Sequence, residues 1–286
     1  MLPVRALAGV ALLAVIAGCS AETNGEEGVV GGDEAALSAL EGEIGFEGAI
    51  ERLDEAALVS IDQDLRALED RGEATAPEIE QVATRKALSA ALKKGRGLRT
   101  STLRTLDVSR PASGGSATTT AQSLVYDSDL FKLNGLEKAL CKAHRIVCVR
   151  VAIAAFKARG GSQAAYRDGN VGGRIDCFRH TYWNAAMTRS VGSEHAKAWA
   201  DAHENGYPQN RATPKDRVLS DMDFFNNDVG RTIGRAHEDS SDDETKDAVR
   251  EALTKGDVRA VRYDLGDRNG KLVPASQCTD TVKCGG

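Results

Sequence analysis

The chain has 286 residues, of which 41% are hydrophobic, and it carries a formal net charge of −5 at pH 7. This length accommodates one good-sized folded domain with an appendage. A net acidic chain whose basic residues are not interleaved with aromatic residues lacks the electrostatic footprint of a nucleic-acid-binding protein, so we expect no nucleic-acid partner.

The N-terminus has the pattern of a secretory signal. A positive charge at Arg5 precedes an apolar run from Ala6 to Ala17, which is shorter than the roughly 20 residues of a membrane-spanning helix. The segment then ends in Ile-Ala-Gly-Cys and resembles the bacterial lipobox, which implies cleavage before Cys19 and lipidation of that cysteine. We therefore predict a lipoprotein signal peptide over residues 1–18. The alternative is an ordinary signal peptide with a cysteine near its cleavage site.

Lipidation of Cys19 would decide where the protein resides and what it contacts first. Two or three acyl chains hold a protein firmly on a membrane, whereas one chain is marginal. The predicted location is therefore the cell envelope, with the membrane bound through the lipid on Cys19. Ser20 follows the cysteine, and the sorting rules of Gram-negative lipoproteins would then favour the outer membrane.

The segment after the lipidation site is acidic. Residues 20–70 contain fifteen acidic and two basic residues, and the Gly-rich stretch over 19–48 is typical of a flexible, solvated tether. Apolar residues then recur at three- and four-residue steps, which predicts a helical hairpin over 49–96. Residues 97–122 are rich in Arg, Ser, Thr and Gly and predict a linker.

The remaining residues, 123–286, are predicted to form the main domain. Helical periodicity marks five segments, over 135–158, 176–190, 193–205, 221–237 and 243–255. After them, apolar residues flank the pair Asn269-Gly270 in the pattern of a β-hairpin with an Asn-Gly turn. The predicted fold class is mostly α: a compact multi-helix domain with a small C-terminal β-hairpin, preceded by the acidic tether and the helical hairpin.

Five further cysteines follow the lipidation site, in a compartment that permits disulfides. Cys278 and Cys284 flank a short polar loop near the end of the sequence. Their spacing favours a disulfide between them.

Two other cysteines, Cys141 and Cys148, fall within one predicted helix. Seven residues of helix separate them by about 10 Å along the axis, beyond the roughly 7 Å between Cα atoms that a disulfide allows. We therefore expect that they do not pair with each other and that Cys177 can take either one. A zinc site formed with His144 is an alternative.

Three of the predicted helices concentrate titratable and amide side chains. These side chains are Arg179, His180, Asn184, His203, Glu204, Asp223, Asn226 and Asn227. Helical spacing places His180 and Asn184 one turn apart on one face. On the third helix, Asp223 and Asn227 share a row with Gly230 and Gly234, where another backbone can approach closely.

If these helices pack together, His180, His203 and Asp223 converge. Two histidines and a carboxylate suit one divalent metal ion with open coordination positions, or a general base that a carboxylate orients. We therefore predict His180, His203 and Asp223 as metal ligands. The predicted catalytic residues are His180, His203, Glu204, Asp223 and Asn227. The residues predicted to position the substrate are Arg179, Asn184 and Asn226.

Two hypotheses follow for the polar cluster. In the first, the protein is an envelope-anchored hydrolase, metal-dependent or histidine-based, and an open cleft lies beside the cluster. In the second, it is a non-catalytic surface-binding or structural domain with an unidentified protein partner. The cluster is then a buried hydrogen-bond network with no pocket beside it. We favour the hydrolase, because a sealed network rarely needs so many titratable groups.

A family resemblance rests on motifs in the three polar segments. FRHTYWNA at 178–185, DAHE at 201–204 and MDFFNNDVGR at 222–231, with an opening helix from residue 136, resemble an uncharacterised bacterial family, domain of unknown function 6973. The resemblance covers about residues 130–265. It implies an α-helical domain, often on secreted or surface proteins, with no established activity.

The segment 176–184 also resembles the catalytic helix of small secreted phospholipases A2. That helix pairs its histidine with an aspartate that follows immediately, whereas Thr181 follows His180 in this chain. A phospholipase A2-like enzyme is therefore a further alternative, with the pairing of its histidine in doubt.

Overall fold

The protein was analysed as a computed structural model, which describes residues 30–72, 74–104, 132–167, 171–264, 266, 268–279 and 282–285. The chain divides into two compact units, residues 1–36 and 37–286. The second unit contains all the side chains of the predicted polar cluster. The predicted signal peptide and Cys19 lie outside the described residues. Among the described helices, none is both long and apolar enough for a membrane crossing.

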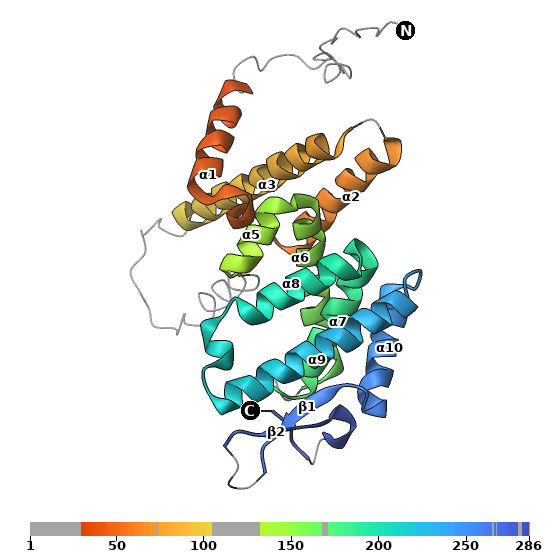
Figure 1. The fold of residues 1–286 in the computed structure, drawn as a ribbon. Coiled ribbons are helices and arrows are strands. Elements are labelled where there is room, and N and C mark those ends of the chain that lie inside the picture. The colour runs from red at the N-terminus through yellow and green to blue at the C-terminus, as the bar shows by residue number, and fades with distance from the viewer. Residues whose placement is uncertain are drawn as a thin grey trace, which may run out of the picture. The chain divides into compact units, whose positions relative to one another are not determined.

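The described fold is mostly α-helical, as predicted, with one small antiparallel hairpin (Figure 1). The α-helices are α1 (Val30–Ile50), α2 (Glu55–Arg71), α3 (Ala76–Arg104), α5 (Gly135–Ala143), α6 (Arg145–Ala165), α7 (Arg174–Val191), α8 (Ser193–Asn205), α9 (Pro214–Ala236) and α10 (Asp242–Lys255). Short 3₁₀ turns cover Pro208–Arg211 and Ala275–Gln277, and the strands are β1 (Arg259–Arg262) and β2 (Lys271–Pro274).

Helix α7 is the central element of the main domain. It packs against α6, α8, α9 and α10, and its side chains are buried from Ile175 to Met187 with one partly exposed exception, Arg179. A helix that is covered on all sides needs small or apolar residues around its whole circumference. Polar side chains on such a helix must therefore find partners inside the protein, which makes α7 the natural element on which to build a polar site.

The N-terminal helices share a core with the main domain. Helix α2 buries Leu58, Ile61 and Leu65 along one stripe and packs against α3 and α6. Arg150 of α6 binds α2 through ion pairs of 2.7 Å to Asp62 and 2.6 Å to Glu69. Helices α2 and α3 cover most of residues 49–96, over which a helical hairpin was predicted.

The structure corrects the expected tether and linker. Helix α1 begins at Val30, and the side chains of Phe46, Ala49 and Ile50 near its end are buried. Ten of the 21 residues of α1 are Ala, Leu or Glu, which are strong helix formers, so an acidic, Gly-rich composition does not by itself keep the chain disordered. Helix α3 also continues through residues 97–104 of the expected linker. Residues 19–29 and 105–122 lie outside the described part.

The expected continuous helix over 135–158 is broken at His144, where φ is −139° and ψ is 73°. The break turns the chain between α5 and α6 and brings the Cα atoms of Cys141 and Cys148 to 4.8 Å, and the two cysteines form a disulfide. The expectation that they cannot pair is therefore wrong, and so is the zinc alternative, because both thiols are oxidised. Cys177 is buried and unpaired.

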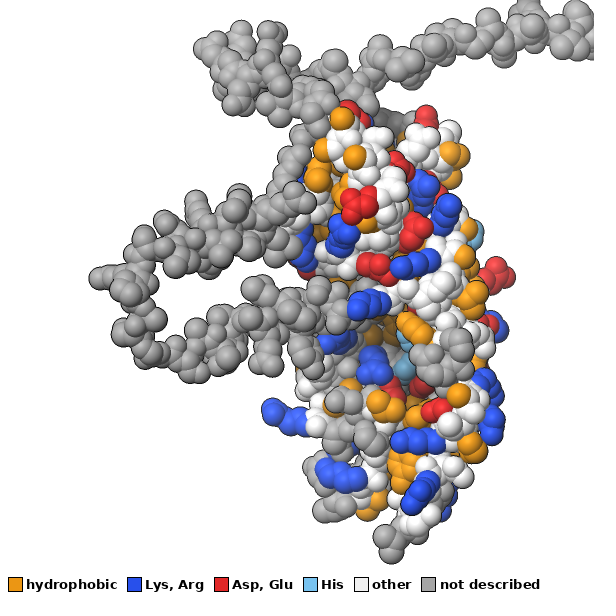
Figure 2. All heavy atoms as spheres, turned by 90° about the vertical axis from the view of Figure 1, so that its left-hand side faces the viewer, with side chains coloured by type: hydrophobic (Ala, Val, Ile, Leu, Met, Phe, Trp, Pro, Cys, Tyr) orange, Lys and Arg blue, Asp and Glu red, His pale blue; other side chains and the backbone are white. Residues whose placement is uncertain are grey.

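The C-terminal hairpin has the predicted antiparallel pairing, with Val261 opposite Leu272. Eight residues connect its strands, so Asn269 and Gly270 lie at the end of a longer loop rather than forming a two-residue turn. A disulfide joins Cys278 to Cys284, the pair that their spacing favours. One face of the main domain carries a hollow in which histidine side chains are visible, with acidic, basic and hydrophobic side chains around them (Figure 2).

Candidate functional site

The site begins at the turn before α7. The backbone N–H of Gly172 donates a 2.7 Å hydrogen bond to Asp176 Oδ2, and Gly172 has φ +76°. The carbonyl of Gly172 accepts from Val261 N at 2.7 Å, and the carbonyl of Val261 accepts from Gly285 N at 2.8 Å. The C-terminal hairpin and the segment closed by the Cys278–Cys284 disulfide therefore hold the turn that orients Asp176.

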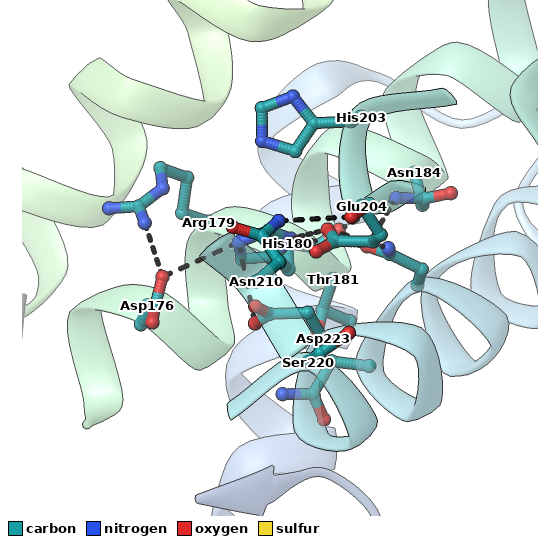
Figure 3. A network of polar contacts seen from close by, with 12 residues as sticks. Asp176, Arg179, His180, Thr181, Asn184, His203, Glu204, Asn210, Ser220 and Asp223 are labelled. Carbon is teal, nitrogen blue, oxygen red and sulfur yellow. Dashed lines mark hydrogen bonds and ion pairs between the residues drawn. The ribbon is translucent and has the colours of Figure 1, made fainter. Parts of the chain in front are cut away.

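His180 lies one helical turn after Asp176 and is the centre of the site (Figure 3). Its Nε2 atom lies 3.5 Å from Asp176 Oδ1 and 3.4 Å from Asp223 Oδ1. Its Nδ1 atom lies 3.5 Å from Glu204 Oε1 and 3.3 Å from Asn227 Oδ1. Helices α7, α8 and α9 thus bring three carboxylates around one imidazole, of which only 7% is exposed.

These carboxylates control the charge of the site. Burial lowers the pKa of His180, but the charge of Asp223, the hydrogen bond to Asp176, and the charges of Asp176 and Glu204 outweigh burial and raise this pKa to about 10. Burial raises the pKa of Asp223 well above its usual value, although the imidazolium opposes the shift. Burial acts in the same direction on Asp176, yet His180 and Arg179 lower its pKa. The imidazole is therefore positively charged in the protein without bound ligands.

The asparagines lie behind this cluster, away from solvent. Asn184 Nδ2 donates to Asn227 Oδ1 at 2.7 Å, and Arg231 Nη1 donates to Asn184 Oδ1 at 3.1 Å. Asn226 Nδ2 donates to the Arg259 carbonyl at 2.8 Å, and its Oδ1 accepts from Arg259 N at 2.9 Å. Because all three asparagines are fully buried, their amides fix the packing of α7, α9 and β1. Asn184 and Asn226, which were predicted to position the substrate, thus bond to other buried groups and are not exposed.

His203 stands apart from the three carboxylates. Its Nδ1 lies 2.8 Å from Glu137 Oε1, and its ring centroid lies 6.1 Å from that of His180. The three ligand atoms that lie within 4.8 Å of one another belong to Asp176, His180 and Asp223. The cluster with metal-ligand geometry therefore contains Asp176, whereas the sequence predicted His203 as its third member.

The sequence analysis assigned no role to Asp176 or Glu137. The i,i+4 spacing of Asp176 and His180 places both side chains on one helix face, and this spacing could have identified Asp176 as a partner of His180. Glu137 belongs to a capping box in which its Oε2 accepts from Asn134 N at 2.7 Å. A capping glutamate is expected to serve its own helix, so its second role as the partner of His203 has no signal in the sequence.

Two cavities open beside the cluster, and Arg179, His180 and His203 border both. The first has a volume of about 380 Å³ and is bordered by all three carboxylates as well as by Tyr207 and Asn210. The second has a volume of about 450 Å³, and its walls include Phe156, Ile175 and Trp183. The open space matches the expectation of the enzyme hypothesis, whereas the buried asparagines match that of the network hypothesis.

Comparison with known proteins adds one match. No curated protein and no solved structure matches the chain. Residues 138–257, which include His180 and all three carboxylates around it, match the family model described as Domain of unknown function (DUF6973), and this confirms the family resemblance over that stretch.

Proposed function

We propose that the protein is a lipid-anchored hydrolase of the cell envelope that cleaves an ester bond in an amphipathic, anionic substrate. The cluster around His180 would activate a water molecule. The water oxygen would add to the acyl carbon, the ester C–O bond would break, and the proton of the water would pass through the cluster to the leaving oxygen.

A single observation supports catalysis: the imidazole of His180 is held between three carboxylates and borders two cavities. A network that only stabilises the fold would gain from excluding water and from pairing every carboxylate with a donor. Here Asp223 Oδ1 is buried without a hydrogen-bond partner among the described residues, and a substrate can reach all three carboxylates. Titratable groups with strongly shifted pKa values beside open space are characteristic of catalytic sites.

The walls of the second cavity support the substrate class. Phe156, Ile175 and Trp183 provide an apolar surface, while Lys132 and Arg159 provide positive charge. A volume of about 450 Å³ lies in the range of small-molecule sites. A substrate with an acyl chain and an anionic head group would satisfy both kinds of surface, and phospholipids of the membrane that holds the anchor have this chemistry.

Activity can be tested with the full chain and phospholipid vesicles of phosphatidylethanolamine, with and without phosphatidylglycerol. We expect release of fatty acid, faster from the anionic vesicles, and a loss of about 100-fold or more in His180→Ala. His195→Ala is the matched control, because His195 contacts His144 and lies outside both cavities. Equal rates in the parent and His180→Ala, or no release from either vesicle, would refute the proposal.

Anchoring can be tested separately in a Gram-negative host. The lipobox-like ending at Cys19 predicts that the full chain incorporates labelled palmitate and sediments with the outer membrane, and that Cys19→Ala does neither. Ser20→Ala is the control, because it keeps the cysteine. Membrane association of Cys19→Ala without label would show that another contact holds the protein at the membrane.

A further inference from the structure

We propose that Asp176, His180 and Asp223 bind one divalent transition-metal ion of the Zn²⁺ type, at the position where the hydrolytic water is activated. The binding site stands on its own geometry, while the assignment of the water to the ion rests on the proposed function. Such an ion lowers the pKa of a bound water and stabilises the negative charge that develops on the attacked ester.

The distances within the site fit an ion better than hydrogen bonds. His180 Nε2 lies 3.4 Å from Asp223 Oδ1 and 3.5 Å from Asp176 Oδ1, beyond the roughly 2.7–3.2 Å of good N–H···O bonds. Ligand atoms bound tetrahedrally to Zn²⁺ at about 2.1 Å lie about 3.4 Å from one another. His180 Nε2 therefore lies at a ligand-to-ligand distance from both carboxylate oxygens, and the three candidate ligand atoms all lie within 4.8 Å of one another.

The hydrogen bonding of Asp223 also supports an ion. Its Oδ1 atom is buried and has no hydrogen-bond partner among the described residues. Buried polar atoms nearly always have partners, and an exception indicates a place where an ion or a water molecule binds. The same oxygen is one of the three candidate ligand atoms, so an ion placed between them would satisfy it.

The surroundings of the ligands are also those of a metal site. Histidines that bind metal through one ring nitrogen usually donate the other N–H to a carboxylate or carbonyl. Nδ1 of His180 faces Glu204 Oε1 and Asn227 Oδ1, which leaves Nε2 for the ion. Asp176 Oδ2 accepts from Gly172 N, which orients Oδ1 toward the site.

Three protein ligands leave at least one coordination position open, as in catalytic rather than structural zinc sites. The cavity of about 380 Å³ is bordered by all three ligands, so water and substrate can reach that position. Arg179 also contacts Asp176 Oδ1, and its side chain borders both cavities. It can therefore turn toward an anionic substrate when the ion occupies the site.

The test uses the full chain without a histidine tag, stripped with a chelator and then dialysed against Zn²⁺. We expect one ion per chain by elemental analysis, and an affinity reduced about 100-fold or more in Asp223→Asn and in His180→Ala. Asp221→Asn, the same change two residues earlier on α9, is the control, because Asp221 is exposed and pairs with Arg211. Thermal melts in chelator establish that each variant is folded.

The possible results distinguish the metal site from the hydrolase activity. Suppose that the parent binds one zinc ion per chain, that Asp223→Asn and His180→Ala do not, and that no protein hydrolyses either vesicle. This result would support the metal site and refute the hydrolase. Hydrolysis that persists in chelator, with no bound zinc, would refute the metal site and support a histidine-based hydrolase. Equal zinc binding by the parent and the site variants would show that the ion binds elsewhere and would also overturn the metal proposal.

Discussion

The substitution Gly230→Ala is expected to lower the free energy of unfolding by about 3 kcal/mol or more. Gly230 lies where α9 crosses α7, and a Cβ atom there would lie 2.2 Å from the carbonyl oxygen of Thr181 and 2.8 Å from Asn184 Cβ. Backbone cannot move aside as a flexible side chain can, so the two helices would have to separate. Their separation would disturb both the asparagine network and the position of His180.

The measurement is urea unfolding of the full chain, followed by circular dichroism. Gly160→Ala on α6 is the matched control, because no atom lies within 4 Å of a Cβ built there. That change should stabilise the protein by about 0.5–1 kcal/mol through helix propensity alone. Equal stability of Gly230→Ala and the parent would contradict the close contact between α7 and α9.

The close contact was partly predictable from sequence. Helical spacing placed Gly230 and Gly234 in one row with Asp223 and Asn227, and both glycines do face backbone atoms of α7. Periodicity therefore identified which residues share a face. It could not identify the helix opposite, because the choice of packing partner depends on the whole arrangement of the fold.

The break between α5 and α6 shows a different limit. Residues 135–158 contain no proline and keep an apolar pattern, so they read as one helix. The structure ends α5 at Ala143 and restarts the helix at Arg145, and the Cys141–Cys148 disulfide closes the turn. Here a covalent constraint between two cysteines overrides local propensity, and the sequence alone shows no sign of which cysteines pair.

The candidate site was also only partly predictable from the sequence. The sequence identified His180, Glu204 and Asp223, which the structure brings together. It also expected His203 beside them, on the assumption that the three polar helices pack together. Trp199 on the same face of α8 is fully buried, yet one turn later the ring of His203 pairs with Glu137 of α5. The position of α5 decided that pairing, and α5 is remote in sequence.

The polar groups of the domain therefore form two layers with different roles. The inner layer, Asn184, Asn226, Asn227 and Arg231, pairs amides with other buried groups and fixes three elements to one another. The outer layer consists of Asp176, His180, Glu204 and Asp223. It brings three carboxylates around one imidazole and borders a cavity. Substitutions in the inner layer should cost stability, whereas substitutions in the outer layer should cost activity.

This division predicts that Asp223→Asn abolishes activity. It also predicts that, in the presence of a chelator at pH 7, the change raises the melting temperature by about 2–4 °C, which corresponds to an increase of about 1 kcal/mol in the free energy of unfolding. Burial beside Asp176 and Glu204 raises the pKa of Asp223 above its ordinary 3.8. The charged form of this carboxyl is therefore less favourable in the folded protein than in the unfolded chain. Asparagine has nearly the same shape and removes that charge.

The pH dependence gives the sign of the effect. Below about pH 3.8 the carboxyl is protonated in both states, so the parent and Asp223→Asn should melt at the same temperature. As the pH rises, the parent loses the stability that protonated Asp223 contributes, and the gap should widen. Asp221→Asn, on the exposed face of α9, should show no such widening. A lower melting temperature for Asp223→Asn at pH 7 would instead place Asp223 in the inner, structural layer and contradict its assignment to the site.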